Sequence, residues 1–331
     1  VSKAAIRWSA SAMDTTTSGS GSQWIPTGFS NQLTDMLNLE RMLVGAIPKL
    51  PMSQNPFTIP TKTARSTAYK GVQNTAPTAS NPTTGSVTFT ASKLITYVPI
   101  SYEINEDAMV DMLPIVKQDL VESLAYSEED CVLNGDTTAS HQDSDVTDAT
   151  DVRKCYKGLR KHALEQNHKI DLATFNADTI ATMIAKMAKY GVRKDKLLWV
   201  AGPKVLSKLL TLRDSQNNAV VLTMDKLGQQ ATFVSGQQGV MFGSKLVAAE
   251  AARENLNASG VYDGSVTSKA GLYLVYLPGW KLGERGGITA ETDRVIKTQS
   301  IDIVASKRED FQPVHAIASE PIVCMGYNIA V

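Results

Sequence analysis

The sequence predicts a mixed α+β protein, and two changes in its residue pattern carry this prediction. Alternating and β-branched apolar residues over 57–63 and 86–104 predict two strands. From Asn105 onward apolar residues recur every three or four positions, which predicts a helix of about five turns. Helical and strand-like segments then alternate to the C-terminus, so neither an all-helical nor an all-strand protein fits.

Composition limits the function classes. The chain has 331 residues, 43% of them hydrophobic, and its 33 basic residues balance its 33 acidic ones. This length and composition are ordinary for a globular protein, whereas the neutral balance argues against a dedicated nucleic-acid binder. No apolar run reaches the roughly 18 residues of a membrane span, so no membrane partner is expected. The three cysteines, Cys131, Cys155 and Cys324, are predicted to be reduced thiols without a metal or redox role.

The segments before the long helix are predicted to reach outward. Residues 9–22 are mostly Ser, Thr and Gly, which indicates a flexible arm. Residues 31–43 have the apolar spacing of a short amphipathic helix or docking segment. The strands at 57–63 and 86–104 are joined by some twenty polar residues and form a long hairpin whose tip has nothing to pack on in its own domain. We expect a neighbouring molecule to supply the missing surface.

The long helix has one apolar face and one acidic face, and Asn134-Gly135 is expected to cap its end. The face predicted to be buried consists of Leu113, Val116, Leu120, Leu124, Ser127 and Cys131. The opposite face carries Asp119, Glu122, Glu128, Glu129 and Asp130.

The second half is predicted to alternate. Helices are expected near 152–164, from an Asn176 cap to 190–191, and from Pro203 to about 212. Strands are expected at 196–201, 246–249, 271–276 and, as a pair turning at 307–310, at 300–305 and 314–318.

No catalytic, cofactor-binding or metal-ligating residue is predicted. None of the four histidines, His141, His162, His168 and His315, has a ligand spacing, so we expect structural or surface roles. The glycines at 239 and 243 have the spacing of a phosphate loop, but Ser244-Lys245 reverses the order that such a loop requires.

Two charged clusters leave alternatives open. The acidic loop that carries Asp143, Asp145, Asp148 and Asp151 is expected to be solvated, with a weak Ca²⁺ or Mg²⁺ site as the alternative. The basic cluster that follows is expected to be a solvated helical face, with phosphate contact as the alternative. Its members are Arg153, Lys154, Lys157, Arg160 and Lys161.

The order of these elements, together with six short motifs, resembles the major capsid protein family of tailed double-stranded DNA bacteriophages, with the Hong Kong 97 fold. The resemblance covers about 23–331. The motifs are Ile25-Pro26, the hairpin at 53–90, Ile104-Asn105-Glu106-Asp107, Leu133-Asn134-Gly135-Asp136-Thr137, Trp199 to Pro203 with 209–215, and Ser306 to Asp310. Departures include Lys70 after Tyr69, where the family often has an acidic residue, and no subunit cross-linking is carried over.

The resemblance implies an N-terminal arm at 1–50, an extended hairpin loop at 51–104, a peripheral domain with a spine helix at 105–155, an axial domain at 156–296, and C-terminal strands at 297–331 that return to the peripheral domain. It implies a virion shell subunit, made in the host bacterial cytoplasm, that forms pentamers and hexamers. Portal, scaffolding or decoration proteins and non-specifically bound packaged double-stranded DNA are the implied partners, and no enzymatic activity is expected. The alternatives are an encapsulin-like compartment shell and an unrecognised α+β enzyme.

The neutral total conceals a segregation of charge. Residues 41–102 carry 6 basic and no acidic groups, whereas 103–151 carry 1 basic and 14 acidic groups. We therefore predict that the hairpin of one subunit lies over the acidic helix of the next, where complementary charge sets register and speeds encounter. The candidate contacts are Lys62, Arg65 and Lys70 on the hairpin and Asp119, Glu122, Glu128 and Glu129 on the helix.

Overall fold

The computed structural model describes residues 42–331 other than 77, 108–111, 224–236 and 316–319. The predicted arm at 9–22 lies outside these residues, as does nearly all of the predicted segment 31–43. The chain forms two compact units. The first contains 93–126 and 286–308, and the second contains 39–92, 127–285 and 309–331. Among the described residues, no helix is both long and apolar enough to cross a membrane.

The first unit is built on a small antiparallel arrangement of strands. β12 (Thr289–Val295) pairs with the first half of β13 (Ser300–Pro313), with Thr289 opposite Ser306 and Val295 opposite Ser300. β4 (Ser92–Ser101) also pairs with β13. α2 (Tyr102–Asp107) and the first part of α3 (Met112–Asn134) complete this unit.

The second unit contains a mixed seven-stranded sheet that holds the main core. Its central strands are almost entirely buried because helices and loops cover them, and every residue of β6 is buried. β6 pairs antiparallel with β10 and parallel with β9. The strand order is β5 (Lys169–Asp171), β14 (Val323–Ala330), β10 (Lys269–Tyr276), β6 (Leu197–Ala201), β9 (Ser244–Ala248), β8 (Gln237–Met241) and β7 (Val221–Leu222).

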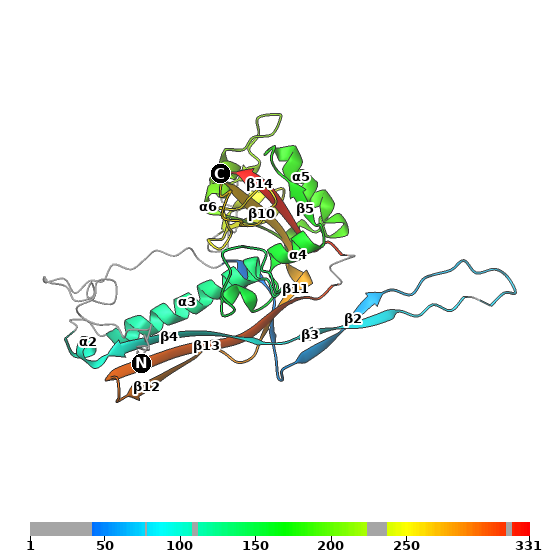
Figure 1. Cartoon of the computed structure of the whole chain (residues 1–331). Helices are drawn as coiled ribbons and strands as arrows, with labels where there is room; N and C mark the ends of the chain where they lie inside the picture. The colour runs from blue at the N-terminus through cyan, green and yellow to red at the C-terminus, as the bar shows by residue number, and fades with distance from the viewer. Residues whose placement is uncertain (1–41, 77, 108–111, 224–236, 316–319) are drawn as a thin grey trace, which may run out of the picture. The chain divides into compact units, whose positions relative to one another are not determined.

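Helices pack on this sheet through the apolar faces that the sequence predicts. α5 (Ala177–Lys186) contacts β14, and α6 (Pro203–Thr211) contacts β10 (Figure 1). Asn176 caps α5 as predicted, because its side chain accepts a hydrogen bond from the Thr179 amide at 2.8 Å while the Thr179 hydroxyl accepts one from the Asn176 amide. Pro203 begins α6, where its missing amide proton costs no helical hydrogen bond.

A second small sheet lies in the same unit. β1 (Lys49–Pro51), which follows α1 (Met42–Ala46), runs parallel to β11 (Trp280–Glu284). β11 pairs antiparallel with the second half of β13. The rings of Trp280 and Phe311 stack with their centroids 4.9 Å apart, which fixes these two strands against each other.

Most predicted strands and helices are confirmed, but the predicted C-terminal strand pair is wrong. The chain does not turn at 307–310, because β13 continues through these residues to Pro313. The four charged residues were interpreted as a turn, yet Lys307, Glu309 and Asp310 are buried. The Asp310 carboxylate accepts the Thr90 amide at 2.7 Å, which keeps a charged residue inside the fold. Of the predicted strand 314–318, residues 316–319 lie outside the described part.

Three further elements differ from the prediction. The helix that Asn176 caps ends at Lys186 and not at 190–191, because a separate 3₁₀ turn, Ala188–Tyr190, follows it. The expected helix at 152–164 is divided into a 3₁₀ turn at Val152–Lys154 and α4 (Leu159–Glu165), because Gly158 in extended backbone caps α4. The run at 86–104 is divided into the end of β3, then β4 and α2.

Candidate subunit-contact surface

The hairpin is a two-stranded sheet of β2 (Phe57–Ala64) and β3 (Thr83–Phe89), drawn out as a long ribbon in Figure 1. Its register places Phe57 opposite Phe89, and Phe89 is fully buried at the base. Beyond the base the residues of β2 alternate between half-buried and exposed. No third strand pairs with it among the described residues.

Polar contacts hold the two strands together. The hydroxyls of Thr58 and Thr88 lie 3.0 Å apart across the strands. Further out, the Ser80 hydroxyl accepts the Thr67 amide at 2.8 Å. Tyr69 and Val72, near the tip, are both more than half exposed. A two-stranded hairpin is marginally stable in water, so this one gains by placing its faces on another surface.

The three predicted basic contacts, Lys62, Arg65 and Lys70, are all exposed on the hairpin. Within the described ranges none of them has an ion-pair partner, and the stretch 41–102 supplies no acidic residue of its own. The hairpin therefore presents uncompensated positive charge.

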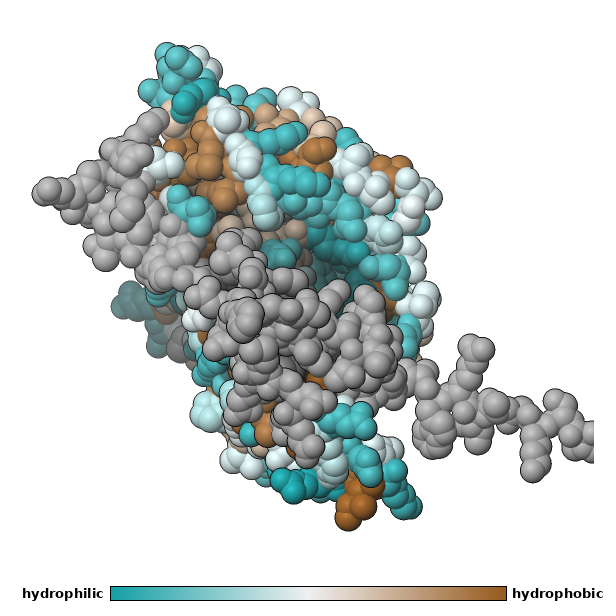
Figure 2. All heavy atoms as spheres, turned by 90° about the vertical axis from the view of Figure 1, so that its left-hand side faces the viewer, coloured by the Kyte–Doolittle hydropathy of each residue, from teal (hydrophilic) through white to brown (hydrophobic). Residues whose placement is uncertain are grey.

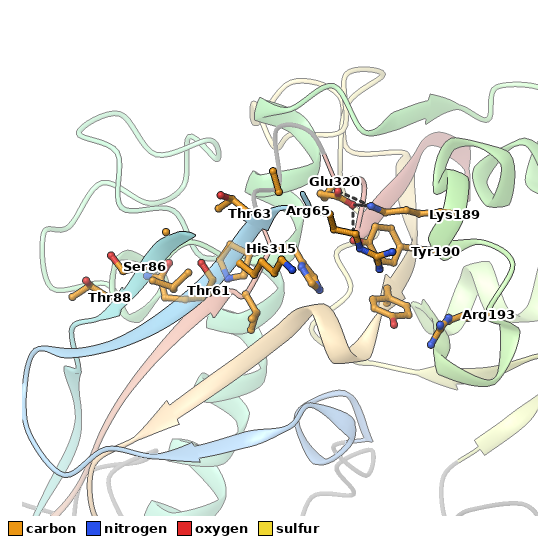
Figure 3. Close-up of a pocket in the computed structure, with 18 residues that line it drawn as sticks. Thr61, Thr63, Arg65, Ser86, Thr88, Lys189, Tyr190, Arg193, His315 and Glu320 are labelled. Carbon is orange, nitrogen blue, oxygen red and sulfur yellow. Dashed lines mark hydrogen bonds and ion pairs between the residues drawn. The ribbon is translucent and has the colours of Figure 1, made fainter. Parts of the chain in front are cut away.

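A cavity of about 1090 Å³ lies beside the hairpin, within the second unit. Figure 3 shows Arg65 of the hairpin with Lys189, Tyr190 and Arg193 from the end of the α5 region. Lys189 pairs with Glu320 at 2.5 Å, and the Tyr190 hydroxyl donates to the same carboxylate at 2.5 Å. Burial acts to raise the pKa of Glu320, but these two donors lower it, so the group stays ionised.

The cavity keeps an excess of positive charge. Basic side chains outnumber the single carboxylate on its walls, and no pattern in the sequence predicts that these segments meet. Its ionisable lining residues are Lys62, Arg65, Lys189, Arg193, His315 and Glu320. The arrangement suits an acidic or polar protein segment better than an apolar ligand.

The predicted buried face of α3 is confirmed. Val116, Leu120, Leu124 and Cys131 are at most 3% exposed, and Leu113 and Ser127 are half-buried. The end of the helix at Asn134 is also confirmed.

The four predicted acidic contacts on α3 separate into two groups. Asp119 is exposed and Glu122 is half-buried, so both are accessible from outside the chain. Glu128 and Glu129 are buried, at 7% and 3% exposure. These two glutamates therefore lie inside the subunit, where a neighbour's hairpin does not reach them.

The expectation that the acidic loop is solvated is wrong for Asp143, whereas Asp145 and Asp148 are exposed and Asp151 is half-buried. The Asp143 side chain is fully buried, where it pairs with the buried Arg160 and, at 2.8 Å, with Arg253. Asp145 is held by Arg253 at 2.7 Å and by Arg153 at 3.0 Å. A guanidinium group can donate hydrogen bonds to two carboxylate oxygens at once, so these arginines and aspartates form one connected network. Asp151 extends it by pairing with Arg153 at 2.8 Å.

The electrostatics of this network favour the charged carboxylates. Burial acts to raise the pKa of Asp143, but the charge of Arg160, the Tyr262 amide and Arg253 together lower it. The pKa of Asp145 is lowered further by its hydrogen bonds to Arg253 and Arg153, again against the effect of burial. The chain's own arginines therefore neutralise Asp143, Asp145 and Asp151.

The basic cluster is correspondingly not a solvated face. Arg160 is fully buried, and Lys161 pairs with the buried Asp136 at 2.9 Å. Asp136 also accepts the Thr138 amide and hydroxyl, so the first turn of the loop is fixed. The clusters were predicted separately and in fact neutralise each other. Arg253 carried no sequence signal because it comes from a loop about a hundred residues away.

One other acidic group lies near the base of β11. Carboxylate oxygens of Glu128, Glu284 and Glu309 all come within 4.8 Å of one another. Glu284 pairs with Lys49 at 2.7 Å, and Glu309 accepts the Tyr156 hydroxyl at 2.7 Å.

Apolar surface is dispersed. Figure 2 shows one face of the molecule, on which apolar side chains gather in limited areas between hydrophilic ones. The most exposed large apolar residues, Ile296 at 84% and Val192 at 80%, are far apart in the sequence. Single exposed apolar residues are ordinary on protein surfaces, so the charged hairpin is the more informative feature.

Comparison with known proteins agrees with this architecture. The model of the phage capsid family matches residues 21–324. The major capsid protein of Escherichia phage T5 is 22% identical over 299 residues, which is 86% of this chain and 58% of that protein. This chain therefore spans less than two thirds of that relative's length.

Solved capsid structures share the fold at low sequence identity. A chain from the capsid of a native GTA particle has a TM-score of 0.65 at 12% identity, with 96% of this chain and 100% of that one covered. A chain from Microbacterium phage Oxtober96 has a TM-score of 0.64 at 12% identity, with 95% and 99% covered. One from Mycobacterium phage Adephagia has a TM-score of 0.61 at 15% identity, with 95% and 97% covered.

An α+β chain with a two-stranded hairpin, a long helix buried along one face and a mixed sheet, matched over at least 95% of its length by phage particle chains, has the Hong Kong 97-like capsid fold. This confirms the predicted fold class. The chain belongs to the phage capsid family.

Proposed function

We propose that this chain is a major capsid protein that self-assembles as pentamers and hexamers into an icosahedral head enclosing phage double-stranded DNA. The family match over 21–324 carries the proposal. The shape of the hairpin supports it, since a two-stranded ribbon with exposed faces and unpaired cations is suited to lie on a neighbouring subunit. The energy of such a shell is spread over many repeated contacts rather than focused on one site.

We assign the extended loop to 51–104, the peripheral domain to 105–155 and the axial domain to 156–296, with the arm at 1–50. The C-terminal segment 297–331 returns to the peripheral domain in this assignment through β13. β14 instead pairs with β10 of the seven-stranded sheet.

The proposed contact between neighbouring subunits involves fewer acidic residues than the sequence predicts. The hairpin cations Lys62, Arg65 and Lys70 approach Asp119 and Glu122 on the α3 of the next subunit, while the buried Glu128 and Glu129 take no part. Because so few exposed charges are involved, the contact contributes more to register and encounter rate than to affinity.

The proposed partners follow from the same role. They are other copies of the chain, packaged DNA bound without sequence preference, a portal, and scaffolding or decoration proteins. The protein is made in the host bacterial cytoplasm and resides in the virion. Its role is structural and not catalytic.

Electron microscopy of the purified full chain tests the proposal. We expect shells with five-fold and six-fold capsomers in negative stain and rapidly sedimenting material in the ultracentrifuge. Sedimentation at a few S, with no large particles with or without a co-expressed scaffolding protein, would overturn it. Particles from the native source that enclose a second protein and lack the ultraviolet absorbance of nucleic acid would indicate a cargo compartment instead.

A further inference from the structure

Two segments of the second unit cross at the end of α3 with their backbones in close contact. The Gly158 amide donates to the Gly135 carbonyl at 2.8 Å, and the Asp136 amide donates to the Arg153 carbonyl at 2.8 Å. A Cβ on Gly135 would lie only 2.3 Å from the Tyr156 carbonyl oxygen, so only glycine fits there. The crossing therefore holds 131–136 and 153–158 in a fixed relation.

Two cysteines lie at this crossing. The Cys131 thiol donates to the Val152 carbonyl, with a sulfur–oxygen distance of 3.3 Å. The Cys155 amide donates to the same oxygen at 3.1 Å, so both residues converge on one atom. The two side chains also interact electrostatically, because each thiol shifts the pKa of the other. Disulfide formation requires such close, pre-positioned side chains.

We propose that Cys131 and Cys155 are a redox pair that forms an intrachain disulfide when the protein meets a small-molecule disulfide such as oxidised glutathione. The pair lies within one chain, so the proposal does not depend on the capsid function. The third cysteine, Cys324, is fully buried in β14.

The surroundings assign different roles to the two sulfurs. Cys155 is half-buried and therefore accessible to an oxidant, whereas Cys131 is fully buried. The neighbouring Cys131 thiol lowers the pKa of Cys155, against the opposing effects of burial and of the carboxylates of Glu309 and Asp151. Burial raises the pKa of Cys131. Thiolates and not thiols attack disulfides, so Cys155 reacts first.

The reaction proceeds in two exchanges. The Cys155 thiolate attacks one sulfur of oxidised glutathione, forms a mixed disulfide and releases one glutathione thiolate, which takes up the proton that Cys155 lost. Cys131 then loses its proton and attacks the Cys155 sulfur, and the second glutathione leaves and takes up that proton. The protein loses two protons and two electrons, and one glutathione disulfide becomes two thiols.

The bond closes a loop from 131 to 155 that includes the acidic loop. Before oxidation, the arginine network, further side-chain contacts and backbone hydrogen bonds hold this loop without a covalent cross-link. The cross-link restricts the unfolded chain, which raises the midpoint of thermal unfolding by roughly 5 °C. Because disulfides persist outside the reducing cytoplasm, the bond would form once the protein leaves the cell.

Peptide mapping of the full chain tests the pair. The protein is incubated with oxidised glutathione, denatured, alkylated and digested without reductant. We expect a single peptide pair linked through Cys131 and Cys155, reversed by dithiothreitol, and an alkylated Cys324, whose burial raises its pKa to about 12.

Three variants complete the test. Cys155→Ser should abolish the cross-link, Cys131→Ala should leave Cys155 as a mixed disulfide with glutathione, and Cys324→Ser is the matched control that keeps the cross-link. If Cys131→Ala does not fold, the peptide mapping of the unaltered chain still shows whether Cys131 and Cys155 are cross-linked. The proposal is overturned if, in saturating oxidised glutathione, Cys131 is alkylated while Cys155 carries glutathione, or if the cross-links join two chains.

Discussion

The hairpin and the acidic loop are both charge-rich segments between regular elements, but the fold uses their charges in opposite ways. Lys62, Arg65 and Lys70 on the hairpin are exposed, with no ion-pair partner in the described part of the chain. Asp143 and Asp145 in the loop are held by arginines of the segment that follows it and by the distant Arg253. The density of charge in a sequence therefore does not say whether a neighbouring molecule can reach it.

The exposed and the buried charges also differ in how much they contribute to stability. Exposed charges are screened by salt over about 8–10 Å and contribute little to stability, so the hairpin's cations act mainly between molecules. Breaking a buried pair such as Asp143 with Arg160 strongly destabilises the fold, because the remaining charge stays buried without a partner.

The largest expected effect comes from breaking the loop's network. Asp143→Asn should lower the free energy of unfolding by about 3–5 kcal/mol, because Arg160 stays buried without its counter-charge. Urea denaturation of the unassembled chain measures it. Asp148→Asn, in the same loop but exposed, is the matched control and should leave the midpoint nearly unchanged. Equal effects of the two variants would mean that the loop is solvated after all.

Acidification should lower the free energy of unfolding through groups in and beside the acidic loop, while the hairpin's basic residues keep their charge. Burial, reinforced by Lys157, lowers the pKa of His162 on α4 to about 4. Between about pH 6.5 and 4 the unfolded chain binds a proton that the folded chain does not, so stability falls on acidification by up to roughly 3 kcal/mol. Below the usual aspartate range the lowered pKa values of Asp143 and Asp145 cause a further loss as these groups are protonated.

Denaturation curves at pH 7, 5.5 and 4 check this dependence. His162→Phe keeps a ring beside Trp280, whose centroid lies 5.2 Å from that of His162, and should flatten the change between pH 6.5 and 4. His315→Gln, at an exposed histidine, is the control. A slope unaltered by His162→Phe would assign the acid sensitivity to other groups.

Reversing the hairpin's charge should affect assembly and not folding. Replacing Lys62, Arg65 and Lys70 together by Glu should change the unfolding free energy by less than about 0.5 kcal/mol, because all three are exposed. We expect assembly to slow by roughly tenfold at low salt, with a smaller difference at high salt. Light scattering measures the rate, and the triple Gln variant should be intermediate. An unchanged rate and salt response in the Glu variant would rule out electrostatic docking by the hairpin.

The smallest expected effect lies on the other side of the proposed contact. Asp119→Asn removes one exposed charge of α3 and should weaken subunit association by about 0.2–1 kcal/mol. Lys117→Gln, at an exposed cation two residues earlier, should act in the opposite direction. The critical concentration for assembly measures both variants. Parallel shifts would show that α3 is not where the hairpin's cations lie.

Local patterns predicted the elements that are stabilised by local contacts. The apolar face of α3, the Asn176 cap of α5 and the buried strand β6 follow from periodicity, capping and hydrophobic runs, which depend on residues close in sequence. The hairpin's exposure followed from its long polar tip.

The failures concern residues whose partners are distant in sequence. The charged residues at 307–310 were predicted to form a turn because their hydrogen-bond partners are distant in sequence. Asp310 accepts a hydrogen bond from Thr90, and Glu309 accepts one from Tyr156. Arg253 meets Asp143 across 110 residues, so the acidic loop read as solvated. Local sequence patterns do not encode such pairings. For the same reason two of the four predicted acidic contacts, Glu128 and Glu129, proved to be buried.

The border between the two units has a consequence for handling the protein. Among the described residues it divides β4 between 92 and 93, α3 between 126 and 127, and β13 between 308 and 309, and it falls in a connection only between 285 and 286. A protease that cuts exposed loops therefore has no site whose cleavage releases either unit whole. Dissection into separately expressed fragments should yield insoluble halves, and calorimetry of the intact chain should record a single endotherm.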